Sequence, residues 1–191
     1  MKPLYWVAIG LLLVLMEART DAGWDIYPNP LGWLLVLLGL RALIRELPDM
    51  PLQLTLWYLG GLALLISCAL VAPSAEDWLE DAEDAVVWAS DLPALAFQAA
   101  LAHVVAGQAL LAGKRSSSLW WRITSIALLI GIVGSMLYLA ADFTWLKGVG
   151  EIGYIGALLF IALCLIHGGR KWAGGGEPPE VKPRRARGEA G

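Results

Sequence analysis

The chain has 191 residues, of which 58% are hydrophobic and only 16% carry a charge. A soluble domain has about 25% charged residues, so this chain has too few charges to cover a water-exposed surface. The composition and the long apolar runs therefore exclude an ordinary soluble domain and indicate a membrane protein.

Six apolar segments follow one another along the chain. They cover approximately residues 3–18, 30–47, 51–72, 92–113, 119–141 and 149–167. About 20 residues are needed to cross the hydrocarbon core of a bilayer, and the last four segments have this length, whereas the first two are shorter. A helix satisfies its own backbone hydrogen bonds in lipid. We therefore expect an all-α, polytopic membrane protein with six transmembrane helices.

The first segment also has a second interpretation. Lys2 and the apolar run that follows it resemble a secretory signal peptide. However, Glu17 and Arg19 occupy the region where cleavage would occur, and no A-x-A sequence follows. Cleavage would leave five helices, but we expect the segment to be retained as the first of six.

The basic residues fall mainly on one side of the membrane if the six segments alternate and the N-terminus is cytoplasmic. Twelve of the 14 lysines and arginines then lie inside, and only Arg19 and Lys147 lie outside. The inner residues are Lys2, Arg41, Arg45, Lys114, Arg115, Arg122, Arg170, Lys171, Lys182, Arg184, Arg185 and Arg187. Cytoplasmic loops of membrane proteins are enriched in lysine and arginine. We therefore expect both termini on the cytoplasmic side.

An acidic stretch separates the third and fourth segments. Residues 75–88 place Trp78, Leu79, Ala82 and Val86 on one side at helical spacing, with acids on the other side. This pattern predicts an amphipathic helix on the outer surface, which either caps the bundle or binds a partner. The acidic face available for docking consists of Glu76, Asp77, Glu80, Asp81 and Asp84.

The last part of the chain, residues 169–191, is rich in glycine, proline and charge and has few apolar side chains. Such a composition cannot bury enough surface to offset the entropy of ordering, so we expect a disordered basic tail on the cytoplasmic side. Its lysines and arginines would set the orientation and attract anionic lipid headgroups, at about 1 kcal/mol for each near the surface. The tail is too short to indicate nucleic-acid binding.

The residues before the second segment form a recognisable pattern, D-x-x-P-x-x-L-G-W-L-L, from Asp25 to Leu35. It resembles the stretch that opens a helix in small, multi-pass bacterial membrane proteins of unassigned function, and it covers about a tenth of the chain. The resemblance implies a multi-pass protein of the bacterial cytoplasmic (inner) membrane. It implies no activity.

The first and last helix pairs share a local pattern. The second segment opens with Leu-Gly-Trp around Gly32, and the sixth opens with Ile-Gly-Tyr around Gly153. The segments before them begin alike, with LYW at Leu4 and LWW at Leu119. We infer that the two pairs are related hairpins that flank a middle pair. Repeats are frequent in transporters, where sites lie at the repeat interface, although they also occur in proteins that transport nothing.

Four ionisable side chains are candidates for an ion or proton site. Glu151 lies among glycines at the start of the sixth segment, and Asp25 and Asp142 are expected on the same outer side. His103 lies within the fourth segment, and an ionisable residue inside a membrane indicates function. The alternatives are a wet carboxylate stabilised by the helix dipole for Glu151 and an interhelical hydrogen bond for His103.

No sequence pattern indicates catalysis, a metal or a cofactor. Cys68 and Cys164 are isolated, which excludes a zinc motif or a C-x-x-C redox motif. His103 and His167 have different expected depths and cannot both ligate one haem, and Ser135 lacks a G-x-S-x-G context. We therefore expect a non-enzymatic assembly component that binds another membrane protein. The alternative is a small cation or proton-coupled transporter or channel.

Overall fold

The computed structural model describes residues 2–16, 29–141 and 148–175, which form helices and turns with no β-strand. Each of the six apolar segments contains one long helix. These are α1 (Pro3–Leu15), α2 (Asn29–Glu46), α3 (Gln53–Ala69), α5 (Asp84–Leu111), α6 (Arg115–Ala141) and α7 (Val149–His167). A short helix, α4 (Pro73–Glu80), and a 3-10 helix, η2 (Lys171–Ala173), complete the described part. The prediction of an all-α fold is confirmed.

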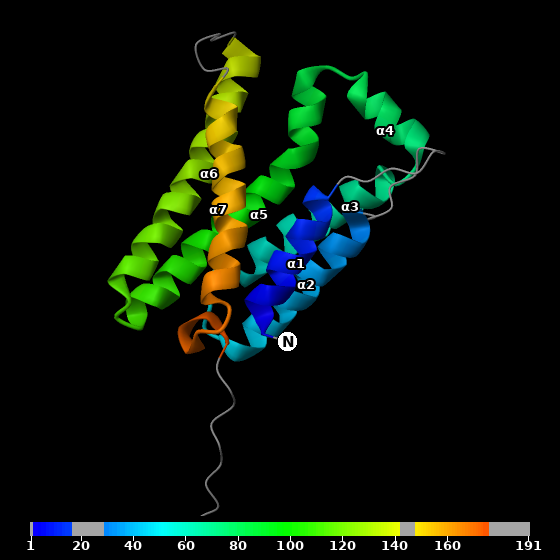
Figure 1. The fold of residues 1–191 in the computed structure, drawn as a ribbon. Helices are drawn as coiled ribbons and strands as arrows, with labels where there is room; N and C mark the ends of the chain where they lie inside the picture. Colours follow the sequence, from blue (N-terminus) through cyan, green and yellow to red (C-terminus); the bar gives the residue numbers. More distant parts are fainter. Residues whose placement is uncertain (1, 17–28, 142–147, 176–191) are drawn as a thin grey trace, which may run out of the picture.

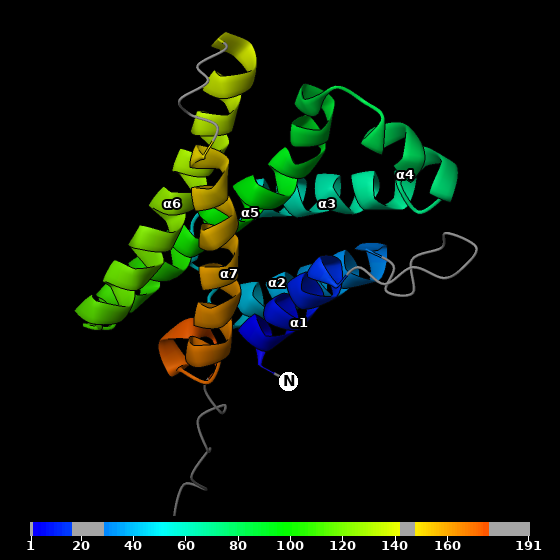
Figure 2. The ribbon, with the colours of Figure 1, turned by 45° about the horizontal axis from the view of Figure 1, so that its top comes forward.

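The six long helices form a closed ring of neighbours. Each long helix packs against the one before it and the one after it in the chain, and α1 packs against α7 to close the ring. Figure 1 shows α6 and α7 side by side, and Figure 2 shows α1 and α2 running together below α3. The short helix α4 lies outside this ring, beside the start of α5.

Three helices of the described residues, α5, α6 and α7, are long and apolar enough to cross a membrane. The 13 residues of α1 and the 17 of α3 rise about 20 and 25 Å, which is less than the hydrocarbon thickness of about 30 Å. Helix α2 has 18 residues, but Arg41, Arg45 and Glu46 make its second half charged. The fold is thus that of a membrane protein with three candidate spans rather than the six that we expected.

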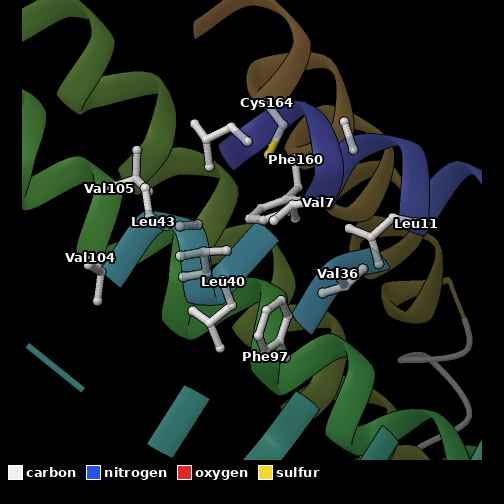
Figure 3. Packing of buried hydrophobic residues seen from close by; sticks show 14 of the residues in the cluster. Val7, Leu11, Val36, Leu40, Leu43, Phe97, Val104, Val105, Phe160 and Cys164 are labelled. Carbon is white, nitrogen blue, oxygen red and sulfur yellow. The ribbon is translucent and has the colours of Figure 1, made fainter. Parts of the chain in front are cut away.

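A single large apolar core joins the helices of the ring. Phe97 of α5 and Phe160 of α7 are completely buried within it, as Figure 3 shows. Trp33 meets Phe97 edge-to-face with ring centroids 5.7 Å apart, and Trp121 meets Phe160 in the same way at 5.6 Å. Edge-to-face aromatic pairs add about 0.5–1.5 kcal/mol to the energy of area burial. The two pairs link α2 to α5 and α6 to α7.

Glycines allow the two helical hairpins, α1 with α2 and α6 with α7, to pack backbone against backbone. A Cβ on Gly32 would lie 2.6 Å from the carbonyl oxygen of Gly10, and a Cβ on Gly153 would lie 3.1 Å from the Cα of Gly131. Gly32 and Gly153 are the two glycines of the shared sequence pattern. Each contact therefore lies near the start of the second helix of its hairpin.

The likeness of the two hairpins does not extend to their first helices. Leu4 lies six residues before Gly10, whereas Leu119 lies twelve residues before Gly131. The LYW and LWW motifs therefore stand at different distances from the glycine contact. The two hairpins share a close glycine contact, and the proposed repeat relationship stays a prediction.

Helix α5 is longer than predicted and bends along its length (Figure 1). Its 28 residues span about 42 Å, which exceeds the hydrocarbon thickness by about 12 Å. Pro93 lies inside the helix, where it removes one backbone hydrogen bond and causes a bend. The sequence predicted that this helix would start near residue 92. The helix instead continues through Pro93 and begins at Asp84.

The start of α1 and the end of α7 lie at the same end of the bundle. The Nζ of Lys2 donates a hydrogen bond to the carbonyl oxygen of Gly169 at 3.4 Å, and Figure 1 shows both segments at one end. We call this the basic end, since Lys114 and Lys171 also lie there, at the start of α6 and after α7. The prediction that the first and last helices share an end is consistent with this arrangement.

The expected disorder from residue 169 onward is wrong for residues 169–175. The N–H of Gly175 donates to the carbonyl of Arg170 at 2.9 Å, and Ala173 is completely buried in the core. Trp172 packs against the same core. The buried surface of these two apolar side chains offsets the cost of ordering this segment, and the average composition of the tail did not reveal it. Residues 176–191 lie outside the described part of the chain.

The glycine contact between α6 and α7 predicts that a glycine-to-alanine substitution at Gly131 changes stability very differently from the same substitution at Gly107. A Cβ at Gly131 would overlap the backbone of Gly153, so Gly131→Ala should lower the free energy of unfolding by about 1–3 kcal/mol. Gly107→Ala is the control, because nothing lies within 4 Å of its added Cβ and alanine favours helices by about 1 kcal/mol. Thermal unfolding in detergent measures both, and equal stabilities would contradict the close contact.

Candidate functional site

The expected outer carboxylates are not brought together by the described residues. Asp25 and Asp142 lie outside the described part of the chain. Glu151 lies in the first turn of α7 with its side chain exposed, where the positive end of the helix dipole favours a carboxylate. Its position agrees with an interfacial acid, and the proposed grouping of the three carboxylates stays a prediction.

His103 is exposed on the outside of the bundle, not directed into its interior. Its neighbours Ala102 and Val104 are buried, so the ring leaves the helix on the opposite side from the core. His103 lies eight residues before the end of α5, about 12 Å from that end. Glu151 lies 16 residues before the end of α7, about 24 Å along, so the two groups are at different heights.

The polar contact that joins α5 to α6 comes from a serine. The hydroxyl of Ser125 donates to the carbonyl oxygen of Ala99 at 3.0 Å, and both residues are buried. Gln98 is also buried, and its Oε1 has no hydrogen-bond partner. Ser125 thus makes an interhelical hydrogen bond of the kind considered for His103, whose own role stays a prediction. Sequence reasoning missed Ser125 because serine is common in apolar helices and gives no distinctive signal.

The acidic segment before α5 forms two helices where one was predicted. The expected helix over residues 75–88 is interrupted after Glu80, and α5 begins at Asp84. The interruption places Asp84 in the first turn of α5, where the helix dipole stabilises its charge. The apolar spacing of the sequence did not reveal this interruption.

Helix α4 and the start of α5 form an element that extends beyond the bundle (Figures 1 and 2). We call residues 73–88 the outer element. The helix α4 carries Glu76, Asp77 and Glu80, while Asp81 and Asp84 are exposed beside it. Trp78 is 63% exposed, and Val86 is exposed as well. The acidic face predicted for docking stays a prediction, because the side chains of Glu76, Asp77 and Glu80 lie outside the described part, and exposed apolar side chains occur in the same segment.

The exposure of Trp78 distinguishes between the two roles expected for this segment. A helix that capped the bundle would bury its large apolar side chains against the ring. Among the described helices, α4 instead contacts only the neighbouring α5 to an appreciable extent, and its one tryptophan stays exposed. The capping role is therefore not supported, and a surface for a partner or for the lipid interface remains.

The described residues contain no group of three or more His, Cys, Asp or Glu side chains that could hold a metal ion. Cys164 is buried, and Cys68 is exposed. Comparison of the chain with protein-family models, with curated proteins and with solved structures gives no match.

The different environments of Ser125 and His103 predict different mutational effects. Ser125→Ala removes the hydrogen bond to Ala99 and should lower the free energy of unfolding by about 0.5–1.5 kcal/mol. His103→Leu should cause no loss, because the side chain of His103 is exposed. Thermal unfolding of both variants in the same detergent compares them. A larger loss from His103→Leu than from Ser125→Ala would contradict the assignment of the polar contact.

Proposed function

We propose that this chain is a non-enzymatic membrane protein that assembles with another membrane protein through its outer element. The observation that supports this proposal best is the exposed Trp78 on a helix that projects from the bundle. Tryptophan is enriched in protein interfaces because it offers a large rigid apolar surface together with an N–H donor. The exposed acids Asp81 and Asp84 add charge around it.

The chemistry of the outer element indicates the kind of partner. Trp78 and Val86 offer apolar contacts, and the exposed Asp81, Glu83 and Asp84 add negative charge to the same segment. A partner with an apolar groove rimmed by lysine or arginine would complement this surface. Such a partner would meet the element at the membrane surface, just beyond the start of α5.

We further propose that all six long helices lie in the membrane, with both termini in the cytoplasm of a bacterial cell. Helices α1, α2 and α3 are short, but they share one core with α5, α6 and α7. Their outward sides carry exposed apolar side chains such as Leu34, Leu54 and Leu65, which favours contact with lipid. Lysines at the basic end support a cytoplasmic location for that end.

Transport of a cation or proton, the alternative expected from the sequence, gains no support from the described contacts. Phe97, Phe160 and Trp121 fill the middle of the described bundle with apolar side chains. His103 faces away from that core, and Asp25 and Asp142 lie outside the described residues. The assembly function is therefore the one that we propose.

Cysteine labelling tests the proposed placement in the membrane. In a Cys68→Ser background, a membrane-impermeant maleimide should label Ser74→Cys in intact cells. It should label Lys2→Cys and Ser116→Cys only after the membrane is opened, because both residues belong to the basic end. The Cys68→Ser chain is the control, since Cys164 is buried. Labelling of Lys2→Cys together with Ser74→Cys in intact cells would contradict six spans.

Photo-crosslinking in native membranes tests the outer element. A benzophenone amino acid at position 78 should give one discrete protein adduct, because Trp78 is exposed on the proposed docking surface. The same group at Trp120 is the control, since Trp120 is 51% exposed but lies at the start of α6, away from the outer element. Asp81→Asn with Asp84→Asn should reduce the adduct. Adducts with lipid alone at position 78, or equal protein adducts at both positions, would reject docking through the outer element.

A further inference from the structure

A pocket of about 520 Å³ opens at the basic end of the bundle, between the start of α6 and the end of α7. Lys114 and Ser117 line it from the α6 side, and His167 lines it from the last turn of α7. The turn that follows α7 supplies the remaining wall, with Arg170 and Lys171 among its residues. We call this cavity the basic pocket.

The charges of the basic pocket are all of one sign. Lys114, Arg170 and Lys171 contribute three cations, and none of the lining residues is an aspartate or a glutamate. Helix α6 begins at Arg115, directly beside the pocket. The first-turn N–H groups of a helix have no partner within the helix, and they carry the positive end of its dipole. Side chains and backbone therefore both favour an anion here.

His167 is the most deeply buried side chain in the wall of the basic pocket. The ring is only 9% exposed and lies between Trp121 and Trp172, with ring centroids 6.1 and 5.2 Å away. Its Nδ1 is buried and interacts with the backbone of Leu163, four residues earlier in α7. The imidazole therefore forms one wall of the pocket between the two tryptophans, and the neighbouring cations supply the attraction for an anion.

The turn after α7 holds the cations in place. The N–H of Arg170 donates to the carbonyl of His167 at 2.8 Å, and the N–H of Gly175 donates to the carbonyl of Arg170 at 2.9 Å. The buried Ala173 anchors the same turn to the core. These hydrogen bonds hold the backbone of the turn, so Arg170 and Lys171 both project from a defined turn at the pocket that Lys114 also lines.

We propose that the basic pocket binds a phosphate group. Arginine and lysine side chains, a helix N-terminus and a serine hydroxyl are the groups that proteins use to bind phosphate oxygens. The phosphate is supplied by an anionic lipid headgroup of the adjoining leaflet or by a soluble phosphate. Trp172 beside the pocket suits the lipid source, because indole rings prefer the headgroup region. The lipid source rests on the proposed placement in the membrane, whereas the phosphate chemistry does not.

Titration of the full chain, purified in a neutral detergent, tests this proposal. Inorganic phosphate and short-chain phosphatidylglycerol are added separately, and native mass spectrometry follows the bound fraction. We expect saturable binding of at least one of them, with Arg170→Gln and Lys171→Gln each weakening it by about ten-fold. Arg122→Gln is the matched control, because Arg122 is an exposed arginine of α6 that does not line the pocket. It should leave binding unchanged.

A variant of the buried ring tests the role of His167. His167→Phe keeps an aromatic side chain between the two tryptophans but removes the ring nitrogens, so it should weaken binding while the thermal unfolding transition is retained. If His167→Phe does not fold, Lys171→Gln still tests the site, because the side chain of Lys171 is exposed.

The two ligands separate the two sources of phosphate. Preference for phosphatidylglycerol identifies a lipid headgroup site, and preference for inorganic phosphate identifies a soluble ligand. Absence of saturable binding of both ligands, or equal weakening by Arg122→Gln and Arg170→Gln, would overturn the proposal. These results are independent of the crosslink at position 78, so the basic pocket and the docking function can fail separately.

Discussion

The direct contact between the backbones of α6 and α7 at Gly131 and Gly153 is the constraint on which the rest of the fold depends. Helices in lipid gain little from hiding apolar surface, so close contact and dispersion must hold them together. The approach of the two helices brings Phe160 against Trp121 and places His167 beside the start of α6. The hairpin of α1 and α2 uses the same device at Gly10 and Gly32.

The six apolar segments predicted the helices well because apolar length is a strong signal. Helix α7 has the expected bounds, and α6 ends where predicted. The errors occur where local chemistry overrides that signal. Helix α5 continues through Pro93 back to Asp84, although the predicted segment began at residue 92, and the segment that apolar spacing treated as one helix is divided after Glu80. Residues 169–175 are ordered because Trp172 and Ala173 pack against the core, although the segment around them is mostly polar.

The functional surfaces were harder to predict because they depend on neighbours that are distant in the sequence. The sequence predicted that Trp78 lies on the apolar side of a surface helix. Only the position of α4 shows that this side chain is exposed and does not pack against the bundle. The sequence placed Lys114, Arg170 and Lys171 on one side of the membrane through their charge alone. Their meeting around His167 requires the ordered turn after α7, which sequence reasoning treated as disordered.

The ring order of the helices has a consequence for how the chain can be connected. Around the ring, the neighbours follow the sequence from α1 to α7, and the contact between α1 and α7 is the one junction without a covalent link. Lys2 and Gly169 meet at that junction. A circular permutant could join Lys2 to the turn after α7 by a short linker and open the chain within α4. Every long helix would then keep its present neighbours. The helix packing of this bundle is therefore cyclic, and the packing itself does not require the chain to start at α1.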